Sequence, residues 1–152
     1  MISNALLGRL APVTLSALRA VAGLIFLAHG TAKLIGWPAT GRSVEMLSLP
    51  WFAGVIELAT GALLAVGFQS RAAAFLASGT MAFAYWIAHA PNSPFPVVNH
   101  GDAAILYCFV FLHVVFAGPG PLSLDALLGR DGRAGAPAKA TAAATESEAE
   151  AA

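Results

Sequence analysis

The chain has 152 residues, of which 58% are hydrophobic and 11% are Asp, Glu, Lys or Arg, whereas a soluble domain is typically about 45–50% apolar and 25% charged. Seven of the 16 charged residues lie in the last 23 positions, so the first 129 residues carry only nine charges and are predicted to be covered by lipid. A net charge of zero argues against a nucleic-acid partner, and the single cysteine, Cys108, excludes an intramolecular disulfide, a Cys-x-x-Cys pair and a c-type haem site.

Four apolar segments are predicted to be membrane-spanning helices. A hydrocarbon core takes about 20 helical residues, and a spanning segment must be helical because lipid offers the backbone no partners. The segments cover about residues 15–36, 51–68, 72–90 and 100–118. Residues 1–14 are predicted to form a short N-terminal cytoplasmic or interfacial segment, and residues 130–152, with almost nothing to bury, a disordered tail.

The connections predict how these helices are joined. Residues 37–50 have the composition of a loop at the membrane surface, and Gln69 to Arg71 predict a tight turn between antiparallel helices. Residues 91–99 contain three prolines and cannot form the interior of a helix. Residues 119–128 predict a turn followed by a short amphipathic surface helix.

Residues 15–129 are therefore predicted to be all-α: an antiparallel, up-down bundle of four transmembrane helices. Orientation follows from the Lys and Arg residues of the short loops, which favour the cytoplasmic side. With the N-terminus inside, that side receives five of them and the outer loops receive only Arg42. Both termini are predicted to be cytoplasmic.

Ionisable residues inside these helices are the candidate site. Lys33 and Glu57 lie at a similar depth in the outer leaflet, and neither is tolerated alone in lipid. They either pair inside the bundle, or Lys33 extends to the outer headgroups and leaves Glu57 protonated by desolvation.

At about 100° per residue, each helix carries one stripe of polar or small residues. We expect the four stripes to meet inside the bundle, because a charge at mid-bilayer costs about 2.5–3.5 kcal/mol. The stripes are Arg19, Phe26, His29, Gly30 and Lys33; Gly54, Glu57, Gly61 and Leu64; Ser78, Ala82, Tyr85 and His89; and Asp102, Leu106, Phe109 and His113.

The remaining polar residues leave alternatives open. His29 either joins the Lys33 network or is satisfied by a backbone carbonyl. Arg19 either interacts with His113 in the inner leaflet or extends to the surface. No H-x-x-x-H or E-x-x-H pair is present, so no metal site is predicted. Asp102 is predicted, with Asn99, to cap the fourth helix.

Three stretches, together with Arg19, resemble the DoxX family of small four-helix bacterial membrane proteins. They are GLIFLAHGTAKLIG at 23–36, IELATGALLAVG at 56–67 and GPGPLSLDALLG at 118–129. The resemblance implies a multi-pass protein of the bacterial cytoplasmic (inner) membrane, tied to quinone-linked oxidation of sulfur compounds or to oxidoreductase complexes with soluble redox partners. The family's recurring polar positions correspond to Arg19, His29, Gly30, Lys33 and Glu57.

A quinone-associated subunit of a membrane oxidoreductase is the first functional hypothesis, with Arg19, His29, Lys33, Glu57 and His89 as the cofactor-binding residues. Arg19 and Lys33 are the first choices for contact with an anion or a quinone carbonyl. The electron donor must be supplied by another protein, so whether the chain is itself an enzyme stays open. The alternatives are a small-solute or proton transporter subunit, for which a homo-oligomer would be required, and a non-catalytic membrane assembly protein.

Overall fold

The computed structural model describes residues 3–41 and 44–130. Within those ranges every regular element is helical, which confirms the predicted all-α class for this part of the chain. The elements are α1 (Asn4–Ile35), α2 (Leu49–Val66), α3 (Ser70–Ala84), the π-helical turn η1 (Tyr85–His89), α4 (Pro96–Asn99), α5 (Asp102–Ala117) and α6 (Leu124–Leu127). Apart from Arg130, the predicted disordered tail lies outside the described residues.

The first helix begins eleven residues before the predicted start at residue 15. The Ser3 hydroxyl accepts a hydrogen bond from the Leu6 N–H and caps the helix. The helix then runs through Pro12, and Ser16 one turn later donates its hydroxyl to the Pro12 carbonyl. Residues 4–14 are thus the first turns of one 32-residue helix, about 48 Å long, which exceeds a hydrocarbon core of about 30 Å.

The other segments lie close to their predicted bounds. Two helices, α1 and α2, are each long and apolar enough to cross a membrane, and α5 is a shorter apolar helix. α3 continues directly into η1, so the third helical segment ends at His89. The proline-rich connection contains the single turn α4, which begins at Pro96 because proline is tolerated at the first position of a helix.

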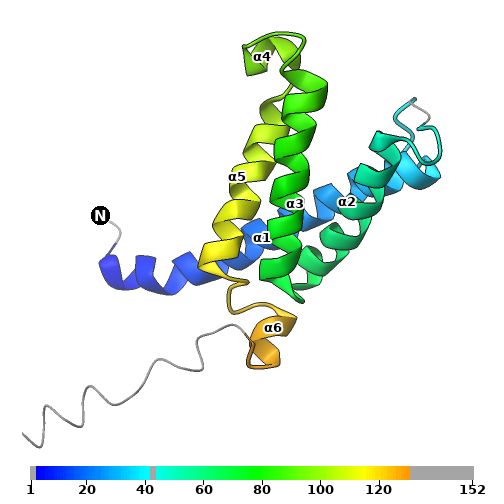
Figure 1. Cartoon of the computed structure of the whole chain (residues 1–152). Coiled ribbons are helices and arrows are strands. Elements are labelled where there is room, and N and C mark those ends of the chain that lie inside the picture. Colours follow the sequence, from blue (N-terminus) through cyan, green and yellow to red (C-terminus); the bar gives the residue numbers. More distant parts are fainter. Residues whose placement is uncertain (1–2, 42–43, 131–152) are drawn as a thin grey trace, which may run out of the picture.

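The four long segments form two helical hairpins that cross each other (Figure 1). α1 packs along α2, and α3 packs along α5, each pair running in opposite directions. α2 and α3 are joined by a tight turn at Gly67–Gln69, two residues earlier than the predicted turn at Gln69–Arg71, because Ser70 and Arg71 already belong to α3. From that turn α2 and α3 diverge (Figure 1).

Glycines bring the backbones of α1 and α2 into direct contact. A Cβ built on Gly61 would lie 2.5 Å from the Leu27 nitrogen, and one built on Gly30 would lie 2.5 Å from the Leu58 nitrogen. A Cβ on Gly23 would lie 2.6 Å from the Ala65 nitrogen. Because no side chain fits in these gaps, the α1–α2 contact depends on small residues, as is common between helices in membranes.

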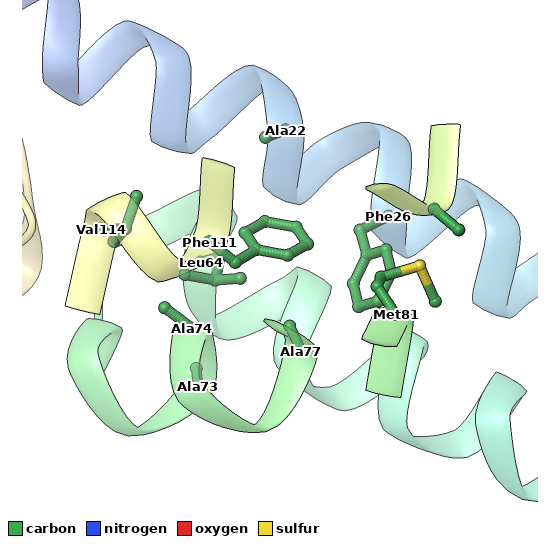
Figure 2. Packing of buried hydrophobic residues seen from close by; sticks show 10 residues of the cluster. Ala22, Phe26, Leu64, Ala73, Ala74, Ala77, Met81, Phe111 and Val114 are labelled. Atoms are coloured by element: carbon green, nitrogen blue, oxygen red, sulfur yellow. The ribbon is translucent and has the colours of Figure 1, made fainter. Parts of the chain in front are cut away.

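The two hairpins share one apolar core where they cross. Figure 2 shows Phe26 of α1, Leu64 of α2, Ala77 of α3 and Phe111 of α5 converging there. The rings of Phe26 and Phe111 meet edge to face with centroids 4.9 Å apart, a favourable arrangement for aromatic pairs. This core fixes the position of each hairpin on the other.

The predicted inward stripes are confirmed on α2 and wrong on α5. All four stripe residues of α2, including Glu57, are buried. On α5 the four predicted residues, including Asp102 and His113, are exposed, and the buried residues are Ala104, Phe111 and Val114. α5 is apolar on every side, so its hydrophobic pattern indicates no inward direction.

We expect Gly61→Ala to lower the stability of the protein by about 1–3 kcal/mol, because the new methyl group must push α1 and α2 apart. The matched control is Gly79→Ala in α3, whose Cβ would meet nothing within 4 Å and which should be neutral or stabilising by up to about 1 kcal/mol. Thermal unfolding in detergent measures both. Equal Tm values for the two variants would contradict the close-contact interpretation.

Candidate functional site

An ion pair joins α1 to α2 in the half of the hairpin remote from the Gly67 turn. Lys33 Nζ lies 2.5 Å from Glu57 Oε1. Glu57 is 2% exposed, and Lys33 is 29% exposed. Of the two sequence-based alternatives, the structure has the paired one. The pair can form because Gly54, one turn before Glu57, lies directly against the Lys33 side chain and adds no bulk there.

Only half of the Glu57 carboxylate is satisfied. Oε1 accepts from Lys33, whereas Oε2 is buried and has no hydrogen-bond partner among the described residues. A buried carboxylate oxygen without a partner costs free energy. Among the described residues, Lys33 therefore provides the one hydrogen bond that the Glu57 carboxylate accepts.

An apolar groove of about 510 Å³ lies between α2 and α3, where the two helices diverge. Its walls include Ala53 and Ile56 of α2 and Gly79 and Phe83 of α3. The volume is in the range of small-molecule sites, which are mostly apolar with a few placed polar groups. Lys33 and His89 are the only ionisable residues among those that line this groove in the described part of the chain.

His89 is the last residue of the π-helical turn η1. π-Helical turns are rare and occur frequently at functional sites. The ring stacks on Tyr85, with centroids 6.5 Å apart, and its Nδ1 lies 2.9 Å from the Asn99 carbonyl oxygen. These two contacts fix the ring at the edge of the groove.

His29 does not join this group. Its ring is exposed, and Nδ1 lies 2.9 Å from the Ile25 carbonyl oxygen one turn earlier. The rings of His29 and Tyr107 of α5 meet edge to face, with their centroids 6.2 Å apart. His29 does not line the groove. Of the two alternatives for His29, the structure therefore has the one in which a backbone carbonyl satisfies the ring.

Arg19 lies at the other end of the α1–α2 pair and is 2% exposed. Its guanidinium donates to backbone carbonyls of the last turn of α2, at Leu64 and Ala65, and of the segment after α5, at Pro119 (2.9 Å) and Leu122 (2.6 Å). The carbonyls at a helix C-terminus lack partners within the helix and carry partial negative charge. Arg19 thus gives hydrogen bonds to the free carbonyls at the end of α2 and connects α2 to the C-terminal segment. It neither contacts His113 nor reaches the surface, so neither sequence-based alternative describes it.

Asp125 of α6 was not singled out from the sequence, yet it is buried at the same end. Its two carboxylate oxygens accept the N–H groups of Gln69 (2.9 Å) and Ser70 (2.8 Å), the start of α3. Burial by itself would raise the pKa of Asp125, but these backbone hydrogen bonds and the charge of Arg130 lower it below the ordinary value. A sequence signal existed: α3 starts without Ser, Thr, Asp or Asn at Gln69, so its cap had to come from elsewhere.

Comparison with known proteins places this arrangement in a family. A family model described as DoxX matches residues 14–90. An uncharacterized protein of Haemophilus influenzae is 39% identical over 120 residues, which cover 75% of this chain and 90% of the relative. The chain belongs to the DoxX family. No solved structure matches it.

The DoxX match begins within the first third of α1 and ends one residue after η1. It therefore includes Arg19, the Lys33–Glu57 pair, both walls of the groove and His89. It does not include α5 or the segment that holds Asp125. The candidate groove belongs entirely to the part of the chain that defines the family.

We expect Lys33→Met to destabilise the protein by up to about 3–5 kcal/mol, because it leaves Glu57 buried without a charge partner. Glu57→Leu should cost less, since the partly exposed Lys33 can turn toward the headgroups. The double variant Lys33→Met/Glu57→Leu should recover most of the loss. Unfolding of the four proteins in mixed micelles gives the coupling free energy, and additive single effects would contradict a direct pair.

We expect Asp125→Asn to lower stability by about 1–2 kcal/mol at neutral pH through loss of the charged cap. The folded-state pKa is lowered, so this contribution is present above the unfolded-state value of about 4 and is lost as the pH falls through the lower folded-state value. The Tm gap between wild type and variant should narrow in acid. Asp102→Asn, at an exposed helix start, is the control and should show a small gap at every pH.

Proposed function

We propose that this DoxX protein is a quinone-associated subunit of an oxidoreductase complex in the bacterial cytoplasmic membrane. The observation that supports it is the apolar groove between α2 and α3, bordered by a lysine that is paired with a buried carboxylate. An isoprenoid tail fits an apolar groove, and a quinone ring needs polar partners for its carbonyl oxygens.

The proposed topology has four spans, α1, α2, α3 with η1, and α5, with both termini cytoplasmic. α1 crosses at a tilt or keeps its first turns at the interface, since it exceeds the thickness of the hydrocarbon core. The positive charges near the Gly67 turn support this orientation, because short cytoplasmic loops are rich in Lys and Arg. Lys33 and His89 then lie toward the outer leaflet, and the groove opens sideways to lipid.

Lys33 supplies the polar contact of this site, and Glu57 holds Lys33 in position. The Lys33 ammonium has three N–H donors; one goes to Glu57, and another can donate to a quinone carbonyl oxygen. Glu57 does not line the groove, and its Oε2 is buried. Its role is to hold the Lys33 ammonium in place beside the groove. Arg19 has no part in this contact, because its donors are engaged with the ends of α2 and the C-terminal segment.

The electron donor is proposed to be a separate, soluble redox partner. Cys108 is the single cysteine of the chain, so the protein has no dithiol of its own with which to pass electron pairs. In the proposed topology the groove lies toward the outer leaflet, so this donor is proposed to act from the outer side of the membrane.

We expect Gly79→Leu to remove quinone from the purified protein. Gly79 lines the groove, and its Cβ would enter open space, so a leucine there fills the site without disturbing the fold. A clash of about 1–3 kcal/mol with a bound molecule corresponds to a roughly 5- to 150-fold loss of affinity. Quinone is measured by extraction and chromatography after purification in mild detergent.

Gly8→Leu is the matched control, since Gly8 is also a helical glycine with open space around it and lies far from the groove. It should retain the wild-type quinone content. Wild-type protein that carries no more quinone than detergent-solubilised lipid alone, or equal retention by both leucine variants, would overturn the proposal.

A further inference from the structure

The hydrogen bond to Asn99 determines what His89 can offer to a bound molecule. A backbone carbonyl is only an acceptor, so Nδ1, 2.9 Å from the Asn99 oxygen, carries the hydrogen. In the neutral imidazole the other nitrogen, Nε2, is then an acceptor. Among the described residues no hydrogen bond to Nε2 is formed, and the ring borders the groove. The groove therefore presents an acceptor at His89 and a donor at Lys33.

The carbonyl that fixes His89 is itself held in place. Asn99 is 5% exposed. Its side-chain amide donates to the Ser93 carbonyl (2.8 Å), and its Oδ1 accepts the Gly101 N–H (2.7 Å). The same turn packs against Tyr85, because a Cβ on Gly101 would lie 2.7 Å from the Tyr85 ring. The connection between η1 and α5 thus holds the Asn99 carbonyl in place, and this carbonyl fixes the tautomer of His89.

We propose that the groove prefers the reduced, hydroxyl-bearing form of its occupant, a hydroquinone, over the quinone, with His89 as the residue that determines this preference. The inference rests on the proposed function. A hydroquinone carries an O–H at each end of its ring, so one hydroxyl can donate to His89 Nε2 while the other oxygen accepts from Lys33. A quinone can use only Lys33, because its carbonyl oxygen and Nε2 are both acceptors.

This preference has a direct consequence for the redox couple. A site that binds the hydroquinone tenfold more tightly than the quinone raises the two-electron potential of the bound couple by about 30 mV. The bound quinone becomes a better electron acceptor than quinone in free lipid. Such a site favours the direction in which a soluble donor reduces membrane quinone.

Binding of three short-tailed probes tests the preference: a hydroquinone, the corresponding quinone and the dimethyl ether of the hydroquinone, which has no O–H. Protein in lipid nanodiscs is equilibrated with each probe under anaerobic conditions, and the bound probe is measured relative to empty nanodiscs. One added hydrogen bond predicts a roughly 3- to 10-fold preference of wild type for the hydroquinone over both other probes.

Two substitutions of His89 separate its two nitrogens. His89→Asn places an amide nitrogen near the position of Nδ1, so it can keep the bond to Asn99 but offers nothing at Nε2; it should bind all three probes equally. His89→Gln places an amide oxygen near Nε2 and should restore part of the preference. Equal binding of the three probes by wild type, or a preference that survives in His89→Asn, would overturn the inference.

Gly79→Leu distinguishes this failure from failure of the proposed function. If wild type binds the probes without preference and Gly79→Leu binds none, the groove is the quinone site and His89 does not select the reduced form. If wild type and Gly79→Leu bind the probes equally, or neither binds any, the groove is not the quinone site and both proposals fail.

Discussion

The ends of the helices impose the main constraint on this fold. Each helix leaves backbone N–H groups unpaired at its start and carbonyls unpaired at its end, and in a lipid environment few waters are present to bind them. Here charged side chains do so: Arg19 bonds the last turn of α2, Arg71 bonds the last turn of α5, and Asp125 bonds the start of α3. Three of the few charges in the first 129 residues are thus explained by helix ends, and all three gather near the Gly67 turn.

Because these contacts are concentrated near the Gly67 turn, the opposite end of the molecule is held together less tightly. The C-terminal segment is bound to α1 by Arg19 and to α3 by Asp125, and the four helices share their apolar core nearby (Figure 2). Beyond the core, α1 with α2 and α3 with α5 continue as separate pairs (Figure 1). The groove is the space between these pairs. A closed bundle with parallel helices would have no such site, so the groove depends both on the tight packing near the Gly67 turn and on the divergence of the helices at the opposite end.

The sequence predicted the parts of this structure that depend on periodicity and on the cost of charge in lipid. The helical segments and the α2 stripe follow from those two rules. The same rules left two alternatives for Lys33, the pair with Glu57 and extension to the headgroups, and the structure has the pair. The inward face of α5 could not be predicted, because a helix that is apolar all round has no preferred face. The roles of Arg19 and Asp125 depend on contacts between residues about 45 to 105 positions apart, and spacing along one helix carries no information about such contacts. Likewise η1, which sets the position of His89, has no signal in the apolar run that contains it.

The degree to which polar groups are satisfied separates structural from functional residues. Every guanidinium nitrogen of Arg19 and both carboxylate oxygens of Asp125 have partners, so replacing either breaks bonds that hold the fold. Two other polar atoms have no hydrogen-bond partner among the described residues: Glu57 Oε2, which is buried, and Nε2 of His89, whose ring borders the groove. The buried Ser70 hydroxyl is also unpartnered, but a neutral hydroxyl costs less to bury than a carboxylate oxygen. A buried carboxylate oxygen without a donor is a cost to the fold, so stability alone explains the Lys33–Glu57 pair less well than it explains Arg19 and Asp125.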